Sequence, residues 1–373
     1  MAGQITPPLQ KQLPNTSYKV KKDNNFVFDQ RTTNILKGIA VILMFAHHFF
    51  GYPEWIAAPN QYTGLPFIGT PWSYSIGKYG SICVSIFAFI TGYGVYFSYK
   101  KGNVFTNSLE KIAVLYIKYW MLLFLFFIPV EFLLGQHEFS ELGLEMLGMQ
   151  TNIICFAWYV RFYLLAMFTL PLLHHLIPKN PAAGILISIL PFHILCVLVR
   201  IWIKTVTVSS FVIALEEYFR YIPMTLLGYC FAQSNLFVKL DDWLRKVHGN
   251  HIWVYLTVLL LSFFIRNHIP YLLYLPTVDI FFICFIVYIF VKFINALHTP
   301  FWQKLLYTLG KHSLYLWFLQ SIFFVAGKKL QFLAYFPKLD LLILIVGFAI
   351  LLPVSIFYTF LYDKTIGRLM NIQ

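Results

Sequence analysis

Charged residues are scarce in this sequence. Only 12% of its 373 residues are Asp, Glu, Lys or Arg, whereas 59% are hydrophobic. A soluble domain normally has about 25% charged residues, because it must cover a water-facing surface. The shortage therefore excludes an ordinary soluble globular protein and predicts that much of the exterior faces lipid. Aromatic residues reach 19%, which suits lipid-facing surfaces and interfacial belts.

Cysteines are also few, and their spacing matches neither a metal site nor a disulfide framework. All of them lie within apolar stretches, so we expect small buried hydrophobic residues and no bound metal. The cysteines are Cys83, Cys155, Cys196, Cys230 and Cys284.

Acidic residues are the scarcer of the two charged classes, with 15 Asp and Glu against 28 Lys and Arg and a formal net charge of +13. Lys and Arg retain loops of membrane proteins in the cytoplasm, so one interpretation of this excess is topological. A second interpretation is a polyanionic ligand on the inner face. Nucleic acid is not expected, because no soluble basic domain is present to bind it.

Apolar runs that approach the roughly 20 residues of a spanning helix recur along the chain. They predict an all-α, polytopic transmembrane helical bundle of about ten spanning helices in one domain. The predicted spans are 34–52, 79–99, 112–134, 155–177, 183–203, 219–236, 252–267, 272–294, 305–327 and 341–362. Lys and Arg are concentrated in the loops that lie inside if the N-terminus is inside. Residues 1–33 and 363–373 are therefore predicted as cytoplasmic tails of a transmembrane domain over residues 34–362.

The loop after the third predicted span carries acidic residues but no Lys or Arg. Residues 138–150, which include Glu145, are predicted to form a short amphipathic helix on the outer surface. Arg161 lies several residues inside the fourth span and requires an anion, a carbonyl or water. Glu216 and Glu217, on the same predicted side of the membrane, are candidate partners.

The first span holds the densest group of ionisable residues, which by default mark a functional site within a membrane. Lys37 and His48 are 11 residues apart, which puts them about 20° from alignment on one helix face and about 16 Å apart along the axis. His47 faces elsewhere, and adjacent histidines diverge too far to bind one metal ion well. In a dry cavity His48 can act as a general base, and Lys37 can attract a phosphate-bearing ligand. The competing interpretation is a snorkelling lysine beside two histidines that hydrogen-bond neighbouring helices.

Two later spans contain polar and aromatic residues that are candidates for lining a cavity. The second span holds Thr91 and Tyr93 around Gly92, and the fourth opens with Trp158 and Tyr159. Simpler interpretations are small-residue helix packing at Gly92 and an interfacial aromatic belt at Trp158 and Tyr159.

Four segments form a series along the chain. The first runs from Lys37 to His48, a basic residue and a histidine with ten residues between them. The later ones are Ile90-Thr91-Gly92-Tyr93, Trp158-Tyr159 and Gly310-Lys311-His312-Ser313-Leu314-Tyr315. This series resembles the membrane acyltransferase-3 family, which has the same opening helix, a Ser-Gly-Tyr segment, a Trp-aromatic helix start and a late Gly-Lys-Asn-Ser-Leu stretch. The similarity runs in the same order from residue 30 to residue 362.

The sequence departs from the family's pattern at two places. Relatives often carry two arginines three residues apart before the third span, where this chain has Lys111 and Val114. Lys118, within that span, is a candidate substitute. Relatives often have a histidine in the late helix where this chain has Gln320.

The resemblance implies an O-acyltransferase of the bacterial inner (cytoplasmic) membrane. It would take acyl groups, usually acetyl, from cytoplasmic acyl-coenzyme A (acyl-CoA) as co-substrate, with no bound cofactor. Acceptors in the family are usually hydroxyl groups of surface polysaccharide, lipopolysaccharide or lipid-linked sugars. On this hypothesis Lys37, Lys111 and Lys118 bind the donor, and His48 acts as general base or carries the acyl group itself. The candidates for the cavity and the oxyanion site are Thr91, Tyr93, Trp158, Tyr159 and Arg161.

Two other classes of protein fit parts of the sequence. A multi-span transporter or flippase for a lipid-linked sugar or a small solute would also have about ten helices with few buried charges, although no internal repeat is visible here. A relative without catalytic activity, acting as a scaffold or sensor, would fit the departures at Val114 and Gln320. Dependence on acyl-CoA separates these hypotheses, and the sequence does not fix the oligomeric state.

Overall fold

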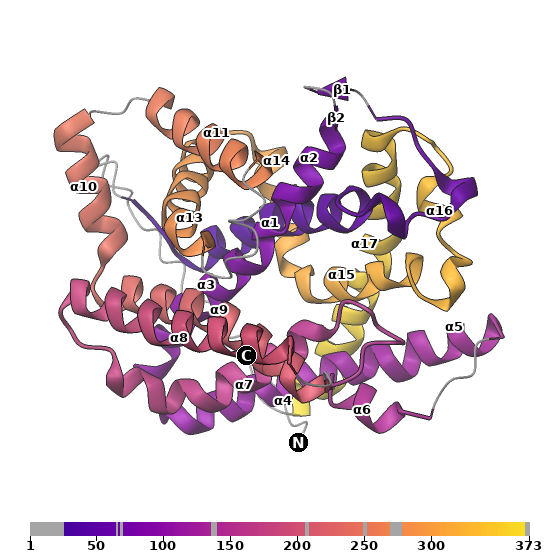
Figure 1. Cartoon of the computed structure of the whole chain (residues 1–373), viewed down its shortest axis with the longest axis horizontal. Coiled ribbons are helices and arrows are strands. Elements are labelled where there is room, and N and C mark those ends of the chain that lie inside the picture. Colours follow the sequence, from indigo (N-terminus) through magenta and orange to yellow (C-terminus); the bar gives the residue numbers. More distant parts are fainter. Residues whose placement is uncertain are drawn as a thin grey trace, which may run out of the picture.

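The computed structural model describes residues 26–64, 66–67, 70–135, 140–205, 209–248, 252–268 and 278–369. These residues form a helical bundle (Figure 1). The exception to helix is one small antiparallel pair of strands, β1 (Pro66–Phe67) and β2 (Thr70–Pro71). Most of the N-terminal tail predicted over residues 1–33, and the last residues of the chain, lie outside the described residues.

The helices follow one another along nearly the whole described chain. In chain order they are α1 (Gln30–Phe50), α2 (Trp72–Gly80), α3 (Ile82–Tyr99), α4 (Val104–Leu122), α5 (Ile128–Leu133), α6 (Leu142–Met146), α7 (Trp158–Leu173), α8 (Pro181–Ile203), α9 (Ser210–Gln233), α10 (Leu236–His248), α11 (Ile252–His268), α13 (Val278–Ala296), α14 (Pro300–Lys311), α15 (Ser313–Leu319), α16 (Phe332–Tyr335), α17 (Asp340–Lys364) and α18 (Ile366–Leu369). A π-helical turn joins α4 to α5, and short 3-10 turns lie at Pro53–Trp55, Ala58–Asn60, His174–Leu176, Gln320–Phe323 and Ala326–Lys328. Every predicted span overlaps one or more of these helices, and residues 272–277 of the eighth span lie outside the described residues.

Six helical segments of the described chain are long and apolar enough to cross a membrane. They are Gln30–Phe50, Trp72–Tyr99, Val104–Leu133, Pro181–Ile203, Asp279–Ala296 and Asp340–Lys364. The prediction of a multi-pass helical membrane protein is confirmed, whereas about ten crossings and the inside position of both termini stay predictions. α9 is long enough to cross, but it carries Glu216, Glu217 and Arg220, whose charges lower its hydropathy.

Helix α1 lies near the middle of the bundle (Figure 1) and packs against α2, α3, α13, α14, α15 and α17. It begins where the Asp29 side chain accepts a hydrogen bond from the backbone N–H of Thr32 at 2.7 Å, which satisfies one of the free donors of the first turn. Leu36, Ala40 and Met44 are completely buried along its length. This position holds both Lys37 and His48 inside the protein rather than against lipid.

Glycines set the closest helix crossings. A Cβ on Gly38 of α1 would lie 2.0 Å from the carbonyl oxygen of Leu306 in α14, and a Cβ on Gly310 of α14 would lie 1.7 Å from that of Asn34. A Cβ on Gly92 of α3 would similarly lie 1.7 Å from the carbonyl oxygen of Thr225 in α9. Small residues allow membrane helices to approach this closely, so the packing interpretation of Gly92 is confirmed.

The structure differs from the sequence-based expectation on the predicted outer side. Instead of an amphipathic surface helix over 138–150, it has the short α6, while residues 138 and 139 lie outside the described residues. Glu145 is only 2% exposed, and its carboxylate accepts hydrogen bonds from the backbone N–H groups of Asn152 and Ile153. Burial raises the pKa of this carboxyl, whereas the two N–H donors lower it. Glu145 therefore organises the loop before α7 and does not face water.

Candidate functional site

His48 lies near the end of α1 and is 7% exposed. Its imidazole stacks on the ring of Phe156, with the two centroids 3.6 Å apart and the planes at 4°. The Nδ1 atom of His48 is buried and has no hydrogen-bond partner among the described residues. A buried polar atom without a partner is costly, so this nitrogen is placed to receive a ligand group.

Gln320 lies beside His48, near enough for the two side chains to interact. It is completely buried in the 3-10 turn that follows α15. Its Nε2 donates to the carbonyl oxygen of Trp317 at 3.1 Å, while its Oε1 has no partner within the described part of the chain. Two buried side chains, from α1 and from the turn after α15, therefore lie side by side, and each has a polar atom without a hydrogen-bond partner in the described chain.

His47 has a different environment from its neighbour. Its Nδ1 hydrogen-bonds the carbonyl oxygen of Gly77 in α2 at 2.9 Å, and its ring contacts Tyr52 edge to face. His47 thus points toward α2, although its ring centre lies 5.3 Å from that of His48. A hydrogen-bonded histidine at a helix contact has a structural explanation that His48 lacks.

A group of aromatic side chains lies next to His48, and we call it the aromatic wall. It consists of Phe156, Trp158, Tyr159 and Trp317. The indole Nε1 of Trp317 donates to the carbonyl oxygen of Phe156 at 3.1 Å. Tyr159 and Trp158 pack against Trp317 with ring centroids 4.7 Å and 6.5 Å away. The hydroxyl of Tyr159 is buried near Thr91 and has no hydrogen-bond partner within the described part of the chain. The structure thus brings Thr91, Trp158 and Tyr159 to the His48 region, joined by Trp317, which we did not predict from the sequence.

Two of the predicted cavity residues lie elsewhere. Tyr93 packs against Phe28, with ring centroids 4.5 Å apart, and against Phe237 of α10. Arg161 forms a two-point ion pair with Glu217, at 2.6 Å and 2.7 Å, and its Nη1 donates to the carbonyl oxygen of Met149 at 3.1 Å. One of the two predicted carboxylate partners of Arg161 is thus confirmed, and this pairing explains the buried arginine without involving His48.

Two of the three lysines predicted to bind the donor lie together near the opposite end of α1. Lys37 and Lys118 lie near enough to repel each other electrostatically. Lys118 Nζ sits 4.3 Å above the ring centre of Tyr362, a cation–π contact. The carboxylate of Asp363 lies near enough to act on Lys118, and Lys118 in turn acts on His312. Residues from α1, α4, α17 and the α14–α15 junction therefore meet here. We call Lys37 and Lys118 the basic cluster.

Lys111 extends this basic cluster along α4. It precedes Lys118 by seven residues, which places both on nearly the same helix face, about 10 Å apart along the axis. Lys111 Nζ donates to Ser98 Oγ of α3 at 3.1 Å. The basic stripe thus runs from the end of α3 toward Lys37.

The acyltransferase domain of the acyltransferase-3 family matches residues 33–361. Together with the six apolar helical segments long enough to cross a membrane, this match defines a membrane protein of the acyltransferase class. The match spans nearly the whole chain, and the chain belongs to the acyltransferase-3 family. No curated protein and no solved structure matches it significantly. The family favours an acyltransferase over the transporter or flippase that the sequence also allowed.

Proposed function

We propose that this protein transfers an acyl group, usually acetyl, from cytoplasmic acyl-CoA to a hydroxyl of a cell-surface or lipid-linked glycan, with His48 as the catalytic base. The observation that carries the proposal is the unpaired, buried Nδ1 of His48 beside the unpaired Oε1 of Gln320. An enzyme of this kind needs a base within reach of the acceptor hydroxyl, in a site that excludes water. The proposed location is the bacterial inner membrane.

The donor would bind with its phosphates on the basic cluster. Lys37 and Lys118 lie together, and neither forms an ion pair within the part of the chain that the structure describes. Among the described residues, two lysines with a single carboxylate, Asp363, near them keep a positive balance that attracts a polyanion such as coenzyme A. Lys111 would extend the attraction toward the solvent, and the thioester would point along α1 toward His48.

The chemical step would take place between His48 and the aromatic wall. The neutral imidazole accepts the proton of the acceptor hydroxyl while the hydroxyl oxygen bonds to the acyl carbon. The carbon–sulfur bond then breaks, and the thiolate of coenzyme A leaves and takes up the proton from the imidazolium. Gln320 Oε1 would accept a hydrogen bond from the acceptor or from the imidazolium. Tyr159, which lies nearer to His48 than Tyr93 does, would donate its hydroxyl hydrogen to the developing oxyanion. In the alternative route, His48 itself carries the acyl group between the two substrates.

The test is transfer of radiolabelled acetyl from acetyl-CoA by the full chain in nanodiscs, with and without glycan acceptors. We expect His48→Ala to lose transfer and donor turnover by at least a hundredfold. The matched control is His47→Ala, which removes the adjacent imidazole and should retain most of the activity. Retention of full transfer by His48→Ala would overturn the proposed role of His48. Failure of the wild-type protein to bind acetyl-CoA would return the transporter hypothesis to first place.

A further inference from the structure

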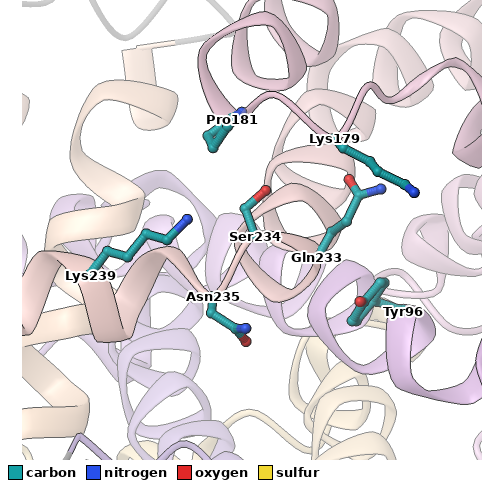
Figure 2. A pocket seen from close by; sticks show the side chains of 7 residues that line it. All are labelled: Tyr96, Lys179, Pro181, Gln233, Ser234, Asn235 and Lys239. Carbon is teal, nitrogen blue, oxygen red and sulfur yellow. The ribbon is translucent and has the colours of Figure 1, made fainter.

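A cavity of about 430 Å³ lies apart from His48, where the ends of several helices meet. It is formed by the last part of α3, the turn before α8, and the turn from α9 to α10. Figure 2 shows its lining residues, which are Tyr96, Lys179, Pro181, Gln233, Ser234, Asn235 and Lys239. Asn235 makes the turn with a φ of 51°, a left-handed conformation that Asn tolerates better than most residues. This turn places residues of both α9 and α10 around the cavity.

The lining of the cavity is positively charged. It includes Lys179 and Lys239 but no carboxylate. Figure 2 shows Lys239 reaching from α10 toward Ser234 and Pro181. Neither lysine forms an ion pair with any residue that the structure describes. The cavity therefore offers two uncompensated positive charges to an anion.

Two polar atoms in the wall also lack partners. Gln233 Oε1 and Ser234 Oγ are buried, and neither forms a hydrogen bond within the described chain. The amide oxygen can only accept a hydrogen bond, whereas the hydroxyl can donate one. A simple anion would satisfy the lysines and Ser234 but not Gln233, which needs a donor such as a hydroxyl group.

We propose that this cavity binds a phosphorylated polyol. The phosphate would contact the ammonium group of Lys239 and accept a hydrogen bond from Ser234, and the side chain of Lys179, which extends past Gln233 in Figure 2, would swing toward it. A hydroxyl of the polyol would donate to Gln233 Oε1. The ligand is the head group of an anionic glycerophospholipid or a soluble polyol phosphate, and the two share this chemistry.

The cavity is separate from the basic cluster proposed to bind the acyl donor. Tyr96 lines the cavity, while Ser98 binds Lys111. The two residues are about 200° apart around α3, so they lie on opposite sides of that helix. None of Lys37, Lys111 and Lys118 lines the cavity. The proposal therefore does not depend on acyl transfer.

The position of the cavity suits a ligand at the membrane surface. Pro181 begins α8, and Tyr96 lies in the last turn of α3; both helices belong to segments able to cross a membrane. The adjoining α10 exposes Val238 by 47% and Trp243 by 55%, as expected of a helix that lies in an interface. By the distribution of Lys and Arg, this is the predicted inner side.

The test is lipid binding by the purified full chain, measured by native mass spectrometry with phosphatidylglycerol and with zwitterionic phosphatidylcholine. We expect preferential binding of phosphatidylglycerol. The double variant K179Q/K239Q should weaken this binding about thirtyfold. Each lysine near an anionic membrane surface contributes about 1 kcal/mol, and about 2 kcal/mol for the pair corresponds to that change in Kd. The control is K246Q, which removes an exposed charge of the same helix outside the cavity and should leave binding unchanged.

A second arm distinguishes the sources of the ligand. Displacement of phosphatidylglycerol by millimolar glycerol 3-phosphate would assign the site to a soluble polyol phosphate, and resistance to it would assign the site to the lipid. Q233L should weaken binding of either polyol but not of inorganic phosphate, and it keeps the lysines in place if K179Q/K239Q fails to fold. Equal binding by wild type, K179Q/K239Q and Q233L, or equal losses in K246Q, would overturn the proposal.

Discussion

The imidazole of His48 and the ring of Phe156 lie almost parallel, 3.6 Å apart at their centroids. Phe156 is itself fixed, because its N–H donates to Ser321 Oγ and its carbonyl accepts from Trp317. Side chains from α15 and from the turn after it therefore fix the backbone of Phe156, just before α7, and with it the ring on which His48 stacks. If His48 is the base, as proposed, it would meet its substrate without rearrangement, and such positioning can supply much of an enzyme's rate.

Phe156→Leu tests this orientation, because it keeps an apolar side chain but removes the flat surface beneath His48. We expect kcat for acyl transfer to fall about tenfold or more, with little change in KM for acetyl-CoA, since small displacements of a catalytic group are costly. The control is Phe324→Leu: Phe324 packs against Phe156 at 5.5 Å without stacking on His48. Equal losses in the two variants would indicate general damage to packing.

The basic cluster leads to a prediction about donor affinity. Lys118→Met should raise KM for acetyl-CoA about tenfold with kcat nearly unchanged, because it removes one charge that attracts the phosphates before the reaction. Lys118→Arg should keep most of the affinity. The effect should shrink as salt is added, since salt screens the attraction. A change confined to kcat would contradict a role in binding the donor.

The crossing of α1 and α14 leads to a prediction about stability. Gly310→Ala would place a Cβ 1.7 Å from the carbonyl oxygen of Asn34, so the two helices must separate. We expect a loss of several kcal/mol, beyond the ~1–3 kcal/mol typical of overpacking because backbone must move, seen as a lower unfolding temperature in detergent. Gly94→Ala is the control: its Cβ would meet nothing within 4 Å, and alanine favours a helix by about 1 kcal/mol.

The ion pair of Arg161 and Glu217 has side chains that are only 9% and 13% exposed. Glu217→Leu should destabilise the protein by about 3–5 kcal/mol, because it leaves a buried guanidinium without its carboxylate. The double variant Arg161→Met/Glu217→Leu should recover part of that loss. Thermal unfolding of the two single variants and the double variant measures the coupling, and additive losses would show that the pair contributes little.

The sequence predicted the helices well because apolar runs report directly on a lipid exterior. Helix phase also predicted that Lys37 and His48 share a side of α1 while His47 faces elsewhere, and the structure places the His47 ring against Gly77 of α2. Lys118 could not be placed in the same way. Its proximity to Lys37 depends on how α4 crosses the bundle, which periodicity within one helix does not reveal.

The sequence analysis was wrong about the environment of Glu145 and did not predict α10 or the role of Trp317. Glu145 stands in an acidic loop, yet it is buried because the loop folds back and supplies backbone N–H donors to its carboxylate. Helix α10 was missed because its apolar residues alternate with Lys239, Asp241 and Asp242 and never form a continuous apolar run. Trp317 was overlooked because a tryptophan within a span usually packs against lipid or a neighbouring helix.

Helix α1 also fixes the distance between the two ends of the proposed donor site. Lys37 and His48 are about 16 Å apart along its axis, and the contacts of Gly38 and Gly310 with backbone fasten it to α14. A donor that engages both residues must keep its anionic group and its acyl carbon separated by about that length. An acyl phosphate, in which the phosphate is bonded directly to the acyl group, is too short. A donor with a long arm between phosphate and thioester fits, so the length of one helix would select the type of acyl carrier.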